Sequence, residues 1–357
     1  MSHPALARAR AFCTANNIRV PILLAPMAGA CPASLSIAVA NAGGLGACGA
    51  LLMPPAAIES WATEFRAASN GGFQLNLWIP DPPPARDAAV EDAVRAFLHR
   101  WGPEVTSGAG DARPPDFVAQ CDAMLQAGPA IISSIMGVYP PAFVTRMKAR
   151  GIKWFATVTT VAEAKAAATA GADAIVAQGM EAGGHRGAFE AANAEAAMVG
   201  LFALLPAVVD AVGVPVVAAG GIADARAATA VFILGASAVQ IGTGFLRCPE
   251  AKLPSAWADA IGRSLPEQTL VTRAFSGRAG RSIATAYARA ASKPGAPPPA
   301  PHPVQRGLTQ AMRDAATKDN DVERMQAWAG QSGGMAPVLP AGDVVRAIWD
   351  GVEAILR

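Results

Sequence analysis

The chain has 357 residues, of which 52% are hydrophobic and 16% are charged. This length and composition allow one large core or two, and they exclude a disordered chain, a collagen-like chain and a small disulfide-stabilised domain. Lysine and arginine number 29 and aspartate and glutamate 27, so the net charge is only +2. Because no basic stripe favours nucleic acid or an anionic membrane, we expect a small-molecule ligand.

The cysteine pattern and the N-terminal sequence indicate the compartment. The five cysteines are odd in number and form no C-x-x-C pair, which favours reduced thiols without a disulfide or structural zinc. Residues 1–17 lack an apolar stretch of signal-peptide length. Residues 20–58 carry no charge, but five prolines interrupt any helix of bilayer length. We therefore expect a cytoplasmic monomer or homodimer with no membrane or nucleic-acid partner.

Short apolar runs alternate with alanine-rich stretches of helical length, which is typical of repeated βα units. Eight such units predict a (β/α)8 TIM barrel, and residues 18–249 have the length of a typical barrel. Strands are expected at residues 18–25, 44–50, 73–79, 130–136, 153–159, 174–177, 215–219 and 238–241. Helices are expected at residues 33–41, 56–69, 141–149, 161–170, 196–211 and 223–234.

Two segments interrupt this rhythm. Residues 80–125 open with a proline-rich stretch and contain two helix-like pieces, so we expect an inserted helical segment after strand 3. Loops that follow barrel strands emerge at the active-site face, where such an insertion would lie. Residues 250–357 include a Pro/Ala tract at 294–303 and predict a C-terminal helical cap. The predicted organisation is a barrel at 1–249 and a helical segment at 250–357 packed on it.

Glycine motifs suggest two different roles. Residues 44–49 match G-x-G-x-x-G, but a helix-like stretch precedes the motif and prolines follow it, which is the reverse of the dinucleotide-binding order. These glycines fit close packing of a helix against strand 2 better. Two other glycine turns, at 220–221 and 242–244, end strands 7 and 8, where many barrels bind phosphate. The alternative is that they are tight turns without a ligand.

A glycine-rich loop after strand 6 contains His185, which can take a proton near neutral pH. The alternative is a solvated loop histidine, an interpretation that suits His3, His99 and His302 better because they lie in a tail, an amphipathic helix and a proline tract. Arg186 could hold an anion or could equally be solvated. No histidine, cysteine or carboxylate stands at ligand spacing from His185, so a metal site is not expected.

Three residues near strands 1 and 3 are ambiguous. Cys31 could face a ligand but is better interpreted as a small buried hydrophobe. Met27 either fills the core or lies against a flat ring. Asn76 lies near the end of an apolar strand and needs a hydrogen-bond partner if it is buried, a role that a ligand heteroatom could fill.

Taken together, these motifs resemble the nitronate monooxygenase family, formerly called 2-nitropropane dioxygenases. The resemblance runs from residue 18 to about residue 340. It rests on A-P-M-A-G at 25–29, N-A-G-G-L-G at 41–46, F-Q-L-N-L-W at 73–78, Q-G-x-E-A-G-G-H-R-G at 178–187, A-A-G-G-I at 218–222, Q-I-G-T at 240–243, S-G-R-A at 276–279 and A-G-Q-S at 329–332.

The resemblance implies an FMN enzyme that detoxifies alkyl nitronates, such as propionate 3-nitronate or the nitronate of 2-nitropropane. Dioxygen would oxidise them to a carbonyl compound and nitrite without NAD(P)H. By the same resemblance, His185 would be the catalytic base. FMN would be bound by Met27, Asn76, Gln178, Gly183, Gly220, Gly221, Gln240, Ile241, Gly242 and Thr243.

Two other functions stay open. Two of these motifs also resemble FMN enoyl-(acyl carrier protein) reductases and NAD(P)H:quinone reductases, namely G-M-E-A-G-G-H at 179–185 and A-A-G-G-I-A-D at 218–224. A nicotinamide-dependent FMN reductase is therefore the first alternative. The scarcity of acid-base residues leaves a non-catalytic flavin-binding protein as the second.

Overall fold

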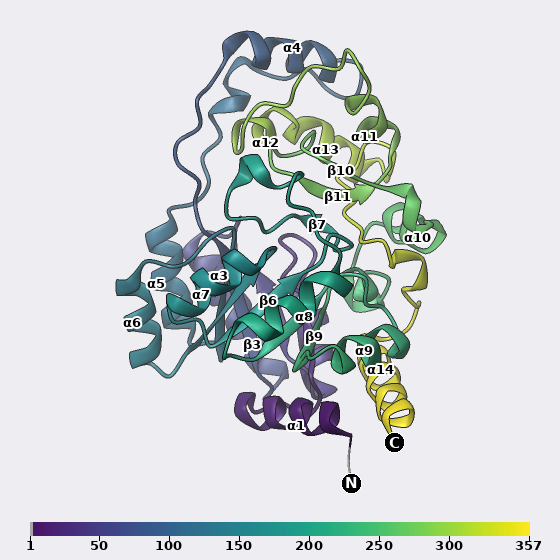
Figure 1. The fold of residues 1–357 in the computed structure, drawn as a ribbon. Helices are drawn as coiled ribbons and strands as arrows, with labels where there is room; N and C mark the ends of the chain where they lie inside the picture. Colours follow the sequence, from purple (N-terminus) through teal and green to yellow (C-terminus); the bar gives the residue numbers. More distant parts are fainter. Residues whose placement is uncertain (1–2) are drawn as a thin grey trace.

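In the computed structural model, which describes residues 3–357, eight parallel strands form a (β/α)8 barrel (Figure 1). The sheet order is β1-β9-β8-β6-β5-β4-β3-β2, and a parallel bridge between Leu23 and Leu45 joins its two edges. The predicted fold class is confirmed. The strands are β1 (Ile22–Leu24), β2 (Gly46–Gly49), β3 (Phe73–Trp78), β4 (Ile131–Ile135), β5 (Lys153–Val158), β6 (Ala174–Gln178), β8 (Val216–Ala219) and β9 (Ala238–Ile241).

The barrel strands are apolar along their length because both of their faces are covered. Every residue of β6 is buried, and Val176 lies opposite Val217 of β8. Helices cover the outside of the barrel, and the last position between α9 and α2 is filled by the C-terminal helix α14 (Ala341–Leu356). The other outer helices are α2 (Ala33–Asn41), α3 (Pro55–Ala68), α5 (Phe117–Ala127), α6 (Pro141–Ala149), α7 (Val161–Thr169), α8 (Leu201–Ala211) and α9 (Ala225–Ile233).

The glycines at 44–49 belong to β2 and the turn before it, not to a dinucleotide loop. A Cβ on Gly46 would lie 2.9 Å from the Phe65 ring and 3.0 Å from the carbonyl oxygen of Ser36. One on Gly49 would lie 2.6 Å from the backbone nitrogen of Ala28. These positions need glycine because helices α2 and α3 and the loop after β1 approach the strand closely.

Helix α1 (Pro4–Asn16) lies at the end of the barrel away from the cap (Figure 1). Its Phe12 packs 6.1 Å from the ring of Phe155, in a cluster with Leu23 and Val217. The helix thereby contributes to the apolar interior at that end of the barrel.

A cap lies over the opposite end and has a core of its own (Figure 1). This core joins Phe97 of the insertion to Phe275, Tyr287 and Leu308 of the C-terminal region. We propose a barrel unit that includes α14, although the sequence analysis ended the barrel at residue 249. The cap helices are α4 (Ala88–Leu98), α10 (Ser255–Arg263), α11 (Ala286–Ala291), α12 (Val304–Leu308) and α13 (Gln310–Lys318). Short 3-10 helices occur along the chain at η1 (Ser107–Asp111), η2 (Ala191–Asn193), η3 (Thr243–Phe245), η4 (Pro249–Ala251), η5 (Pro266–Gln268) and η6 (Gly333–Met335).

A small antiparallel sheet also lies in the C-terminal region, where only helices were expected. It has the order β10 (Thr269–Thr272), β11 (Gly280–Ile283), β7 (Gly184–His185). Its third strand comes from the loop after β6, so the sheet ties that barrel loop to the cap. Between residues 3 and 357, no helix is both long and apolar enough to cross a bilayer.

Candidate active site

A cavity of about 500 Å³ lies at the carboxyl ends of the barrel strands, under the cap. This is the face where barrels place their active sites, and the volume is in the range of small-molecule sites. The structure brings all the predicted site residues to this cavity. Its lining includes Met27, Asn76, Gln178, Gly183, His185, Gly220, Gly221, Gln240, Ile241, Gly242 and Thr243.

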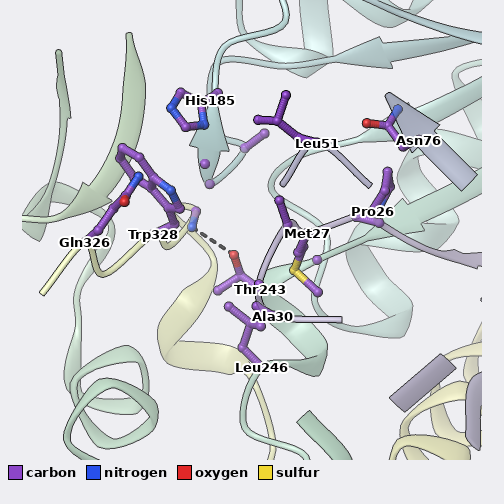
Figure 2. Close-up of a pocket in the computed structure, with 18 of the residues that line it drawn as sticks. Pro26, Met27, Ala30, Leu51, Asn76, His185, Thr243, Leu246, Gln326 and Trp328 are labelled. Carbon is purple, nitrogen blue, oxygen red and sulfur yellow. Dashed lines mark hydrogen bonds between the residues drawn. The ribbon is translucent and has the colours of Figure 1, made fainter. Parts of the chain in front are cut away.

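One side of the cavity is formed by the loop after β1 together with residues at β3. Pro26, Met27 and Leu51 lie on this side, and Asn76 lies near them in Figure 2. Asn76 is 5% exposed, and its Nδ2 donates to Ser133 Oγ at 3.0 Å. Met27 is half-buried, with its sulfur 3.2 Å from where a Cβ on Gly242 would lie. The methionine therefore belongs to the cavity wall and packs against the core at once.

A second polar group comes from the barrel interior. Gln74 Nε2 donates to Gln240 Oε1 at 3.1 Å and to the carbonyl oxygen of Leu24 at 3.0 Å. The hydrogen bond from Gln74 occupies Oε1 of Gln240. The Nε2 group of Gln240 has no acceptor among residues 3–357. Since Gln240 lines the cavity, its amide N–H groups are available to a ligand there.

The turns after β8 and β9 supply backbone donors. Gly220 (φ +105°) and Gly221 (φ +70°) adopt left-handed conformations that favour glycine. Their N–H groups donate to no atom within the described chain. Thr243 begins the turn η3, whose first N–H groups have no partner within the helix. These groups together offer an anion-binding arc.

The C-terminal region closes this arc from the other side. The Gly330 N–H donates to Thr243 Oγ1 at 3.0 Å, the contact drawn in Figure 2. Gly330 also seats directly against Gly183, where a Cβ would collide with the Gly330 nitrogen. Glycine is therefore needed at position 183, because the loop after β6 and the segment around Gly330 come into direct contact there.

The backbone at His185 is held on two sides. Gln178 Nε2 donates to the carbonyl oxygen of His185 at 3.1 Å, and Gln178 Oε1 accepts from the Gly187 N–H at 2.8 Å. On the other side, His185 pairs with Gly280 of β11. Most of the Gln178 amide is thus used inside its own loop, where it fixes the histidine backbone.

The His185 ring lies between two tryptophans and beside a serine. Its centroid is 4.6 Å from that of Trp78 and 4.8 Å from that of Trp328, both in edge-on geometry, and Figure 2 shows Trp328 next to the ring. Its Nε2 lies 2.7 Å from Ser276 Oγ. Burial lowers the pKa of His185 well below 6.5, and the positive charges of nearby cap residues lower it further. The imidazole is therefore neutral at pH 7.

The expectation that His302 is a solvated residue of the proline tract is wrong. The side chain is half-buried, lines the cavity, and lies 5.4 Å from the Trp78 ring. Its pKa is lowered to about 4, first by burial and then by Arg278 and Arg306. Ala300 and Val304, on either side of His302, belong to the cap core and so hold this end of the tract against the cap.

The sequence analysis also missed several residues that line the cavity. Most belong to the cap, and their signal in the sequence is weak because their segments lie far from the barrel motifs. Trp78 had a usable signal, since it ends the barrel strand that carries Asn76. The missed residues include Trp78, Ser276, His302, Arg306, Arg313, Gln326 and Trp328.

Two ambiguous residues have structural roles. Arg186 is 8% exposed, and its guanidinium donates to the carbonyl oxygens of Gln178 at 2.6 Å and Thr159 at 3.4 Å, so it is neither solvated nor directed to an anion. Cys31 is buried, and its thiol donates to the carbonyl oxygen of Ala25 at 3.2 Å. Burial raises the Cys31 pKa to about 12, so the thiol is unreactive at neutral pH.

The comparisons with known proteins extend over nearly the whole chain. The profile of the nitronate monooxygenase family matches residues 11–351. The chain belongs to the nitronate monooxygenase family. A probable nitronate monooxygenase of Staphylococcus aureus (strain Newman) is 33% identical over 347 residues, which cover 96% of each chain. The protein is therefore an oxidoreductase.

Solved structures extend the likeness. The nitroalkane oxidase of Streptomyces ansochromogenes superposes with a TM-score of 0.85 at 32% identity, covering 95% of this chain and 97% of that one. FabK of Thermotoga maritima superposes with a TM-score of 0.75 at 26% identity, covering 97% and 96%. Both superpositions therefore extend over the barrel and the cap of this nitronate monooxygenase family member.

Proposed function

We propose that the protein binds FMN in the barrel cavity and oxidises alkyl nitronates with dioxygen to a carbonyl compound and nitrite. The observation that carries the proposal is the placement of His185. Its neutral imidazole lies beside a cavity lined by backbone donors at one end and by side-chain amides at the other. Membership of the nitronate monooxygenase family supports the same chemistry.

The donor set fits FMN. Phosphate would lie at the arc formed by the N–H groups of Gly220, Gly221 and Thr243, because bare backbone donors at glycine turns favour an anion. The ring edge needs directional polar partners, which Asn76 and the free Nε2 of Gln240 supply. Met27 offers an apolar, polarisable surface for a flat ring. Gln178, Gly183, Ile241 and Gly242 complete the proposed set.

The remaining chemistry is divided between cofactor and protein. When bound, FMN supplies the redox step by accepting electrons from the nitronate and passing them to dioxygen. His185 takes the carbon proton of a neutral nitroalkane, which must become a nitronate before it is oxidised. After that transfer, the imidazolium lies beside the anionic nitro group and stabilises it. Trp78 and Trp328 restrict water around the ring.

Anaerobic mixing tests this function. The purified protein is expected to be yellow and to release FMN on denaturation. Its flavin absorbance should bleach with an alkyl nitronate alone, and nitrite should appear once oxygen is admitted. A colourless protein that takes up no FMN would contradict the proposal, and so would a flavin that no nitronate bleaches.

A nicotinamide-dependent reductase is the second candidate, supported by the likeness to FabK across nearly the whole chain. In the same experiment, bleaching by NAD(P)H and not by a nitronate would identify this activity. Bleaching by neither would leave a flavin-binding protein without catalysis.

A further inference from the structure

The active-site cavity adjoins a second cavity of about 840 Å³ under the cap. The second cavity lies between the insertion, at residues 104–115, and the C-terminal region, at residues 302–314. Much of its lining is apolar, with Val105, Ala109, Leu308 and Ala311 among the residues that form it. Six residues line both cavities: Leu51, Leu52, His302, Arg306, Gln310 and Asp314.

Arg306 stands at this junction without a counter-ion. Its side chain is half-buried, and its guanidinium makes no hydrogen bond and no ion pair with residues 3–357. Its neighbour Asp314 also lines both cavities and attracts Arg306 through space, but the two side chains form no ion pair. A guanidinium that is withdrawn from water without a carboxylate is costly, and an anionic ligand would offset that cost.

A second arginine beside it is also unpaired with any carboxylate. Arg313 is 8% exposed and lines the active-site cavity. Its guanidinium donates to neutral acceptors, namely Thr309 Oγ1 at 3.1 Å, the carbonyl oxygen of Arg306 at 2.9 Å and Gln310 Oε1 at 2.6 Å. This arrangement fixes Arg313 against the backbone of Arg306 and adds its positive charge to the junction.

The charged groups around the second cavity offset Arg306 only in part. Asp111 is bonded to Arg86, and the Asp314 carboxylate, which accepts a hydrogen bond from the Gln310 amide at 2.6 Å, attracts Arg306 without pairing with it. Glu104 and Arg113 also line the second cavity. At the junction the two guanidinium groups of Arg306 and Arg313 therefore lie with the single carboxylate of Asp314.

We infer that Arg306 binds an anionic group of the substrate, a carboxylate or a phosphate, while an apolar part attached beside that group occupies the second cavity. The inference deepens the proposed function, on which it rests, because it describes the part of the nitro compound that does not react. A planar guanidinium binds both oxyanions in a forked geometry. The nitro compound that this site favours would thus carry a second, anionic group and an apolar part.

Calorimetric titration of the FMN-loaded protein tests the site without requiring turnover. The probe is 2-benzylpentanedioate, in which one carboxylate stands for the nitronate and the other for the proposed anionic group. We expect Arg306→Gln to raise its dissociation constant about 10- to 100-fold, the usual range for a lost charged hydrogen bond. Arg306→Lys should give a smaller loss, because it keeps the charge but not the fork.

Matched variants separate contact from general charge. Arg289→Gln removes one exposed positive charge from α11 of the same cap and should leave the dissociation constant unchanged. Ala311→Trp narrows the second cavity and should weaken 2-benzylpentanedioate much more than unsubstituted pentanedioate. If that variant does not fold, Ala311→Leu makes the same comparison. A phosphonate analogue shows whether carboxylate or phosphate binds more tightly.

The outcomes are distinguishable. Unchanged binding in Arg306→Gln overturns the inference, as does an equal loss in Arg289→Gln or equal affinity for the benzyl and unsubstituted diacids. In a third outcome, Arg306→Gln binds the diacid normally but loses flavin bleaching by NAD(P)H. That result would also overturn the inference, because Arg306 would then bind a phosphate of the nicotinamide cofactor. Binding that depends on Arg306 in a protein that no nitronate bleaches would support the anion site while rejecting the proposed function.

Discussion

Ser276 holds the ring of His185 through a single hydrogen bond. Its Oγ lies 2.7 Å from His185 Nε2, 3.3 Å from the carbonyl oxygen of Arg278 and 3.4 Å from the Arg278 nitrogen. Because a hydroxyl both donates and accepts, and the Arg278 backbone offers one acceptor and one donor, Ser276 keeps this bond with either neutral tautomer of the imidazole. The cap therefore orients the histidine that the barrel loop carries.

Removing this hydroxyl should misorient the base. We expect Ser276→Ala to lower the rate of flavin reduction by a neutral nitroalkane about tenfold, as for the loss of one hydrogen bond of ordinary strength. Ser276→Thr keeps the hydroxyl and should retain more of the rate. The discriminating measurement is the pH profile, which a merely structural defect would scale down without moving its inflection.

Removing the base itself should have a larger and more selective effect. His185→Asn is expected to slow anaerobic flavin reduction by a neutral nitroalkane about 100- to 10,000-fold. The rate with a preformed nitronate should fall less, because its carbon proton is already gone. FMN occupancy is measured first, and His99→Asn on the exposed end of α4 serves as the control. Equal losses on both substrate forms would assign His185 to positioning instead.

The depressed pKa of His185 predicts the pH dependence. Proton abstraction needs the neutral imidazole, and the folded-state pKa lies well below 6.5. The rate with a neutral nitroalkane should therefore stay constant as the pH falls through 6.5 and decline only in more acidic solution. An inflection at 6.5 in stopped-flow flavin reduction would contradict this. Circular dichroism at each pH must show that the fold persists.

Acid should also destabilise the fold through His302. Its pKa is about 4 in the folded protein, against an ordinary value of 6.5. The unfolded chain then binds the extra proton more readily between these values, so the free energy of unfolding falls as the pH drops from 6.5 towards 4. Urea unfolding of His302→Asn should show a weaker decline over this window than the parent protein does.

Substitution in the proposed phosphate arc should release the cofactor. Gly221→Val places a branched side chain at φ +70°, so the turn must move and carry its N–H groups with it. We expect the dissociation constant of FMN to rise at least about tenfold, as when one charged hydrogen bond is lost. Gly213→Val is the control, because Gly213 has open space around it and no left-handed backbone. Fluorescence titration with FMN measures both.

The cap core should contribute to the alignment of the site as well as to stability. Phe275 is fully buried and packs 5.1 Å from Tyr287 and 5.7 Å from Trp328. Phe275→Ala is expected to lower the free energy of unfolding by about 3–5 kcal/mol and to reduce kcat, because Ser276 and Trp328 lose their support. Phe202→Ala, at a position that is 74% exposed, should change stability by less than about 0.5 kcal/mol.

The barrel could be predicted because its information is local. Helices α2 and α6 occupy the predicted residues, and each barrel strand lies within or beside an apolar run. The helix expected at 196–211 begins only at Leu201. The Glu181 carboxylate accepts the Leu201 N–H at 3.0 Å and so caps the helix at this residue. That contact joins residues 20 apart and has no signature in a short window of sequence.

The half of the site that comes from the cap could not be predicted, since it depends on pairings between distant segments. Strand β7 has two residues and exists only because Gly280 and Arg281 pair with it. His302 looked like a solvated residue of a proline tract, and only tertiary packing places it, half-buried, at the cavity. Motifs at the barrel strand ends could be found because every such turn meets at one face.

The pairing of β7 with β11 has a consequence for the order in which the active protein is made. His185 is seated by Gly280 and Ser276, which are synthesised more than ninety residues after it. A growing chain on the ribosome can therefore complete all eight barrel strands and the glycine turns before Ser276 and Gly280 emerge. His185 gains its partners from the cap only after that point.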